Sequence, residues 1–139
     1  SVRKRFNQRN MRHILLAIYC SFFVNVNDQK INLDDFYGTW QLDKYSDDEQ
    51  YYHPPKKEMG DVIRLNQDMT ITTVSEGKKT QGTWLYNTNG RYIEFKEEQG
   101  TKEKMAIHFL SKKSMVATYD TDEYRIWEVH FVKVKQNNP

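Results

Sequence analysis

Three of the four histidines and two glutamates are the residues best suited to acid–base or metal chemistry. His53, His108 and His130 are too widely spaced for a short metal-binding motif such as His-x-x-x-His. Glu94 and Glu128 could serve as general acid and general base across an enclosed interior, but a chain with 19 acidic residues contains many such pairs. No nucleophile motif or phosphate-binding glycine loop accompanies them. We therefore predict no enzyme: no catalytic residues, no metal site and no cofactor.

A second group of side chains is suited to holding a ligand by burial and by contact with aromatic rings. Strand alternation places on one face Trp84, Tyr86, Tyr119, Arg125, Trp127 and Phe131. If this face points inward, Arg125 needs a carboxylate, carbonyl groups, an aromatic ring or a bound anion as its partner. Two interpretations stay open, because these rings either fill the core of a small barrel or partly line a cavity. We take the six residues as the candidate ligand-binding set.

These side chains must be positioned by β-strands. Segments rich in Val, Ile, Thr and aromatic residues recur at residues 37–44, 61–66, 70–75, 81–87, 92–96, 104–110, 114–119 and 124–134. Turn-forming residues separate them, so successive strands are expected to be antiparallel neighbours. Eight such strands can close on themselves and leave no exposed edge. We predict an all-β fold, an eight-stranded antiparallel up-and-down (meander) barrel, with an open sandwich as the alternative.

Alternation also predicts the inward face of each strand. In the segment 104–110, the side chains of Met105, Ile107 and Phe109 are expected on the same, inward face. His108 and Leu110 fall on the opposite face, where we expect the histidine to meet solvent.

A repeated tripeptide marks two of the strands. Gly38-Thr39-Trp40 returns as Gly82-Thr83-Trp84. A glycine lets a ring or a backbone approach closely, and a tryptophan two residues later points to the same face of its strand. Ile-Arg-Leu-Asn-Gln-Asp, at residues 63–68, forms a turn between the two copies. This combination resembles the small bacterial lipocalin-like domains of the calycin superfamily, over residues 33–134.

The resemblance implies an eight-stranded barrel whose first tryptophan, here Trp40, sits at the closed end against an arginine of the last strand. It makes Gly38, Trp40 and Gly82 the structural residues that close the barrel. Arg125 lies near the beginning of the last strand, whereas antiparallel closure places the end of that strand, near Lys133, beside Gly38.

The one long connection runs from residue 46 to residue 60. Its two prolines favour an extended chain, and loops of this length in small domains are often functional. We expect it to lie over one mouth of the barrel and to present Tyr51, Tyr52 and His53 for contact with a partner.

The N-terminal residues 1–26 have the pattern of a secretory signal peptide, in which basic residues precede an apolar run. The run, residues 14–24, is too short to span a bilayer comfortably. Acylation of Cys20, as in a lipoprotein, and an apolar helix retained on the barrel are the alternatives. We expect an exported protein (periplasmic, outer-membrane-attached or secreted) that meets a membrane only through this leader or an acyl anchor.

Charge argues against a nucleic-acid partner. The 139-residue chain has a net charge of +2, but residues 1–26 hold five basic residues and no acidic ones. The remaining chain has 16 basic and 19 acidic residues, so it is mildly acidic and would repel phosphates. The single cysteine also excludes an intramolecular disulfide.

The predicted organisation has four parts: a leader (1–26), a connector with a short helical turn (27–36), a lipocalin-like β-barrel (37–134) and a polar tail (135–139). The predicted function is that of an exported lipocalin-like binding protein, which holds a small apolar or amphipathic ligand in the barrel without catalysis. The alternative is a filled barrel that acts through its loops as a protein-interaction or inhibitor module.

Overall fold

The computed structural model describes residues 30–136. The chain divides into two units, Ser1–Ile31 and Asn32–Pro139, and the fold below is that of the second. The predicted leader, Cys20 and the last three residues of the tail lie outside the described residues. Within the described residues, no helix has the length and apolarity needed to cross a membrane.

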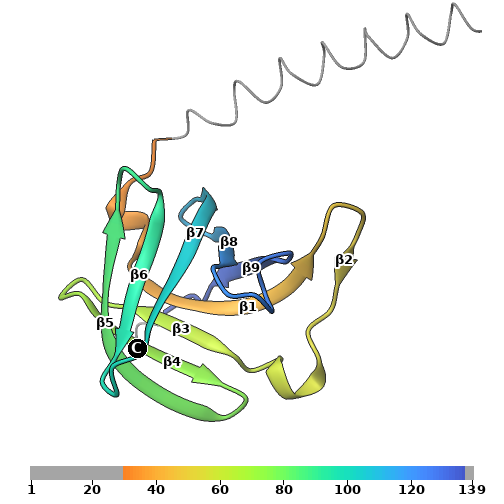
Figure 1. Ribbon diagram of the computed structural model, residues 1–139, viewed down its shortest axis with the longest axis horizontal. Coiled ribbons are helices and arrows are strands. Elements are labelled where there is room, and N and C mark those ends of the chain that lie inside the picture. Colours follow the sequence, from red (N-terminus) through yellow and green to blue (C-terminus); the bar gives the residue numbers. More distant parts are fainter. Residues whose placement is uncertain (1–29, 137–139) are drawn as a thin grey trace, which may run out of the picture. The chain divides into compact units, whose positions relative to one another are not determined.

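Nine strands and two short 3-10 helices make up the second unit (Figure 1). The strands are β1 (Gly38–Ser46), β2 (Tyr51–Tyr52), β3 (Val62–Leu65), β4 (Thr70–Ser75), β5 (Lys78–Asn87), β6 (Tyr92–Glu97), β7 (Lys102–Leu110), β8 (Ser114–Tyr119) and β9 (Glu128–Lys133). The 3-10 helices are η1 (Leu33–Phe36) and η2 (Lys56–Glu58). The Asn32 side chain accepts a hydrogen bond from the Asp34 amide and begins η1, which is the short helical turn predicted within residues 27–36.

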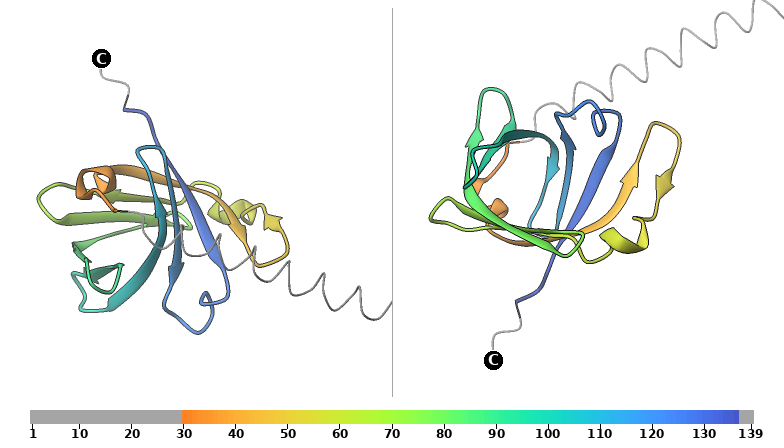
Figure 2. Two further views of the ribbon diagram at one scale, coloured as in Figure 1. Left: turned by 90° about the horizontal axis from the view of Figure 1, so that it is seen from above. Right: turned by 60° about the horizontal axis from the view of Figure 1, so that its bottom comes forward.

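The strands close into a barrel because β1 has a partner on each side. It pairs with β3 along one edge and with β9 along the other, and the strands from β3 to β9 follow one another in sequence order. Every pairing is antiparallel, and the strands run around a ring (Figure 2). The prediction of an eight-stranded meander barrel is confirmed, and the open sandwich is excluded. The short strand β2 lies outside the ring of eight and pairs with the last two residues of β1 (Figure 1).

One end of the barrel is closed by Trp40. This ring has no exposed surface, and its Nε1 donates a hydrogen bond of 2.8 Å to the Phe36 carbonyl. Trp40 pairs with Lys133 across the β1–β9 seam, and the Lys133 amine lies 4.8 Å from the centroid of the ring. The same amine donates to the Asp35 carbonyl at 2.7 Å. Lys133 thus joins the last strand to the first strand and to η1.

Two glycines lie at places of close contact, of which Gly38 is at the closing seam and Gly82 is between β5 and β6. Gly38 has a φ of +131°, a conformation that side-chain-bearing residues rarely adopt, and the stem of Lys133 lies directly over it. Gly82, in β5, faces the backbone of β6 so closely that a Cβ there would collide with the Lys96 carbonyl oxygen. Both glycines therefore occupy places where two backbones or a long side chain come close together.

Two β-bulges change which residues face inward. The register of β1 against β9 shifts between Leu42 and Lys44, so Tyr45 points inward beyond the shift. In β7 the register against β8 shifts after Ile107. Leu110 is consequently buried and Phe109 is exposed, so the alternation predicted for residues 104–110 is wrong at its end. A bulge inserts one unpaired residue, which reverses the face of every residue after it.

The last strand begins later than the sequence indicates. Residues 124–127 form a turn instead of the start of a strand, because the Thr121 hydroxyl accepts from the Tyr124 amide and the Thr121 carbonyl accepts from the Arg125 amide. A threonine that binds backbone amides in this way offers the chain an alternative to strand pairing.

Replacement of Lys133 with methionine tests the closure. Lys133→Met keeps the apolar stem and removes both the contact with the Trp40 ring and the hydrogen bond to the Asp35 carbonyl. We expect a loss of about 1–2 kcal/mol in the free energy of unfolding, measured by urea denaturation. Lys135→Met, at an exposed position of the same chain end, is the control. Equal stabilities of the two variants would show that the amine does not hold the seam.

Candidate functional site

The barrel interior is filled at one end and hollow at the other. Around Trp40, the closed half is packed with buried side chains that include Phe36, Leu65, Ile93, Met105 and Met115. The other half contains a cavity of about 580 Å³. Its apolar lining consists mainly of Leu42, Ile63, Ile71, Phe95, Val129 and Phe131.

Tyr45 enters the cavity because of the bulge in β1. Its hydroxyl donates a hydrogen bond of 3.1 Å to Glu58 Oε2, and Glu58 ends the short helix η2. Burial, followed by the nearby Glu58 charge, raises the pKa of Tyr45 well above its ordinary value. The tyrosine therefore stays protonated and holds the Glu58 carboxylate at the mouth of the cavity.

Seven carboxylates surround this mouth: Glu58, Asp61, Glu76, Glu97, Glu103, Asp122 and Glu123. Two of them have basic partners outside the cavity, since Glu76 lies 3.1 Å from the Lys57 amine and Asp122 lies 3.5 Å from the Arg125 guanidinium. No lysine, arginine or histidine of the described chain lines the cavity. The opening is therefore strongly acidic.

Glu97 and Glu103 are diagonal neighbours on adjacent strands. Glu97 is two residues beyond the inward-facing Phe95 in β6, and Glu103 is two residues before the buried Met105 in β7. Phe95 and Glu103 are direct partners in the register of these two strands. Burial first, and then the charge of Glu97, raises the pKa of Glu103. The pair thus brings two like charges together at the upper edge of an apolar cavity.

Aromatic rings form one wall between the cavity floor and its mouth. Phe95 and Tyr119 contact each other edge to face with centroids 6.3 Å apart, and Tyr119 contacts Tyr124 at 6.1 Å. Burial raises the pKa of Tyr119, and the Glu103 charge adds to this effect. Ring faces and carboxylates therefore share the same wall.

The predicted ligand-binding residues divide between three places. Tyr119 and Phe131 line the cavity. Trp84 and Tyr86 belong to the closed end, where Trp84 Nε1 donates to the Asn66 carbonyl at 3.0 Å and Tyr86 packs against Phe36 at 5.0 Å. These two rings therefore pack against Phe36 of η1 and help to fill the closed end.

Arg125 and Trp127 lie outside the cavity. The Arg125 side chain is 61% exposed and its guanidinium lies 3.1 Å from an Asp120 carboxylate oxygen. It needs no buried partner because it sits in the turn before β9. Trp127 packs edge to face against Tyr52 with centroids 5.2 Å apart. Neither side chain lines the hollow part of the barrel.

The predicted loop contacts lie beside β1 and not across the mouth. Tyr51 is 66% exposed, contacts the His130 ring at 5.6 Å and has the Lys44 amine 4.4 Å above its face. The Tyr52 hydroxyl donates to Asp47 Oδ2 at 2.8 Å. His53 follows in the chain and is exposed.

Ser46, His130 and Glu128 meet at the β1–β9 seam without the geometry of a catalytic triad. Ser46 Oγ lies 2.7 Å from His130 Nε2, and the Glu128 carboxylate approaches the same ring nitrogen at 3.9 Å. In a triad the carboxylate binds the opposite ring nitrogen. Burial and the nearby Lys44 lower the pKa of His130, so the ring is neutral at pH 7. We interpret the cluster as a group of polar side chains that helps to hold β1 and β9 together.

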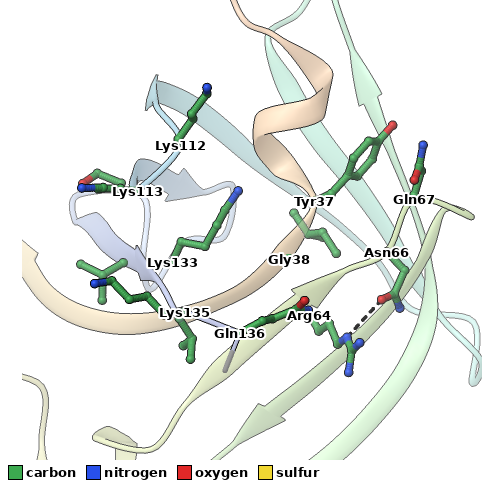
Figure 3. Close-up of a pocket in the computed structure, with 14 residues that line it drawn as sticks. Tyr37, Gly38, Arg64, Asn66, Gln67, Lys112, Lys113, Lys133, Lys135 and Gln136 are labelled. Carbon is green, nitrogen blue, oxygen red and sulfur yellow. Dashed lines mark hydrogen bonds between the residues drawn. The ribbon is translucent and has the colours of Figure 1, made fainter. Parts of the chain in front are cut away.

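A second pocket, of about 710 Å³, lies at the closed end (Figure 3). Its charged lining consists of Arg64, Lys112, Lys113, Lys133 and Lys135. The Lys133 amine is already bound to the Asp35 carbonyl, and Arg64 donates to Asn66 within the pocket wall (Figure 3). The two ends of the barrel thus carry opposite charges.

Several cavity residues were not predicted from the sequence. Glu97 and Glu103 could have been placed inward by alternation from Phe95 and Met105, since no bulge intervenes. Tyr45 had no such signal, because the bulge that turns it inward is created by pairing with β9.

The raised pKa of Glu103 predicts how the stability of the protein depends on pH. A carboxyl with a higher pKa in the folded state binds more protons there, so its contribution to stability falls as pH rises above its ordinary value of 4.5. We expect Glu103→Gln to increase the free energy of unfolding at pH 7 and to change it little at pH 3. Glu98→Gln, at the exposed turn after β6, is the matched control for loss of charge. If Glu103→Gln is less stable than the wild-type protein at pH 7, the proposed repulsion between Glu97 and Glu103 is contradicted.

Comparison with known proteins places the chain in a family. A family model described as a lipocalin-like domain matches residues 36–117, and no curated protein matches the sequence. A crystal structure of a DUF4847 family protein from Bacteroides vulgatus ATCC 8482 is similar with a TM-score of 0.49 and 14% identity, over 72% of this chain and 94% of that chain. A de novo designed fluorescence-activating β-barrel gives a TM-score of 0.45 and 12% identity, over 73% and 95% of the two chains. The family match covers more than half of the sequence, and the chain therefore belongs to the lipocalin-like domain family.

Proposed function

We propose that this protein is a binding protein that holds a small apolar or amphipathic ligand inside the barrel and catalyses no reaction on it. The observation that carries the proposal is the cavity of about 580 Å³ in the open half of the barrel. Sites for small molecules in proteins usually have volumes of about 300–1,000 Å³ with a mainly apolar lining and a few polar groups. The cavity has this size, and its floor is apolar, whereas its mouth is lined by carboxylates.

The contrast with the closed half supports the same function. Trp40, Phe36 and the side chains around them leave that half filled, as protein interiors ordinarily are. The side chains around this hollow lack the packing contacts that a filled interior would provide. Occupation by an apolar ligand would restore the missing contacts.

Export is part of the proposal and rests on the sequence. Residues 1–26 have the basic and apolar pattern of a leader, and they lie outside the described residues. An exported location would let the barrel capture its ligand outside the cytoplasm.

The alternative function, a protein-interaction module that acts through the long loop, has weaker support. Tyr51 contacts His130 and Lys44, and Tyr52 contacts Asp47 and Trp127. These rings have partners within their own chain. This alternative assumed a filled barrel, and the cavity supports the ligand-binding proposal instead.

Two adjacent threonines of β4 allow a matched test. Thr73 lines the cavity, whereas Thr72 does not. We expect the neutral dye N-phenyl-1-naphthylamine to fluoresce on binding to the wild-type protein, and decanol to displace it. Thr73→Trp would fill part of the hollow and reduce the dye signal at least tenfold, whereas Thr72→Trp would retain it.

Circular dichroism and thermal melting are the controls that must show both variants to be folded. Equal dye binding by the two folded variants would place the dye elsewhere and contradict the proposed site.

A further inference from the structure

We infer that the ligand of the barrel is a cationic amphiphile, an organic ammonium group joined to an apolar body. This inference rests on the proposed function, because it assigns a chemical class to the same cavity. Its basis is the combination of an apolar floor, an unbalanced acidic mouth and an aromatic wall with a free hydroxyl group.

The mouth has more negative charge than its surroundings neutralise. Seven carboxylates and no basic side chain line the cavity. Glu76 and Asp122 are paired with Lys57 and Arg125. The other five form no ion pair within the described part of the chain, although Glu58 also feels the charge of Lys57 and Asp61 accepts hydrogen bonds from the Ser75 hydroxyl and the Glu76 amide. Charged groups gathered in this way favour a positive partner and repel a negative one.

Glu97 and Glu103 give this charge a definite place. They occupy diagonally neighbouring inward positions of β6 and β7, and Glu103 is the direct partner of Phe95. Their mutual repulsion and their partial burial destabilise the empty protein. A cation between them would relieve both effects, whereas a neutral or anionic headgroup would relieve neither.

The aromatic wall adds a second and independent feature. Tyr119 lies between Phe95 and Tyr124 and lines the cavity. Its hydroxyl group has no hydrogen-bond partner among residues 30–136, and its oxygen is open to solvent, because no fully buried side-chain oxygen of these residues lacks a partner. Tyrosine faces attract ammonium groups, and a free hydroxyl group can bind a polar atom of the ligand.

The arrangement fits an organic cation better than a metal ion. In the described residues, no three acidic, histidine or cysteine side chains converge on one point. The carboxylates are instead distributed along the mouth, above an apolar floor formed by residues such as Ile71 and Phe131. A metal ion would use no apolar floor, whereas a ligand with an alkyl or aromatic body would fill it.

A set of three decyl compounds tests the headgroup while the apolar chain stays the same. Decyltrimethylammonium, decanol and decanoate are titrated into the full-length protein by calorimetry at pH 7.5 and low salt. We expect the cation to bind at least tenfold more tightly than decanol, and decanoate to bind most weakly.

A charge-removal pair identifies the groups responsible. Glu97→Gln/Glu103→Gln should weaken decyltrimethylammonium binding about tenfold more than it weakens decanol binding. Glu49→Gln/Glu98→Gln removes the same charge from exposed positions outside the cavity and should preserve the preference.

The outcomes separate the inference from the function on which it rests. Equal binding of the three compounds, tighter binding of decanoate, or an equal effect of both charge-removal pairs would overturn the cationic ligand while the binding function stands. If none of the three binds and N-phenyl-1-naphthylamine gives no signal, the proposed function itself fails, and the inference fails with it.

Discussion

The contact between Trp40 and Lys133 is the interaction on which the rest of the barrel depends. A meander of eight strands encloses an interior only if its first and last strands pair, and these two residues are partners at that seam. The lysine amine lies over the buried ring and also binds the Asp35 carbonyl, so one side chain fixes β9, β1 and η1. Gly38, with its φ of +131°, provides the room for the lysine stem.

Because the side chains that close the barrel gather at one end, the other end stays open to a ligand. The rings of Phe36, Trp40 and Trp84 fill the closed half, and the bulge in β1 turns Tyr45 into the open half. The charges follow the same division, with basic side chains around the closed end (Figure 3) and carboxylates around the cavity mouth. A ligand that approaches the open end therefore meets negative charge first and apolar surface second.

The sequence predicts the framework better than the cavity. Turn residues and alternation locate the strands, and antiparallel closure alone places Lys133 beside Gly38. Alternation fails at Tyr45 and Leu110, because a bulge is decided by the pairing between strands and leaves no signal within one strand. Arg125 fails to reach the interior for a different reason, since the hydrogen bonds of Thr121 turn that segment before β9 begins.

The central claim is that a ligand occupies the open half of the barrel, and nuclear magnetic resonance tests it most directly. Amide shifts of the isotope-labelled protein are followed during titration with decanol. The account predicts that the largest changes fall on cavity residues such as Leu42, Thr73 and Tyr119, with small changes around the closed end. Changes concentrated at Arg64, Lys113 and Lys135, or no saturable change, would contradict it.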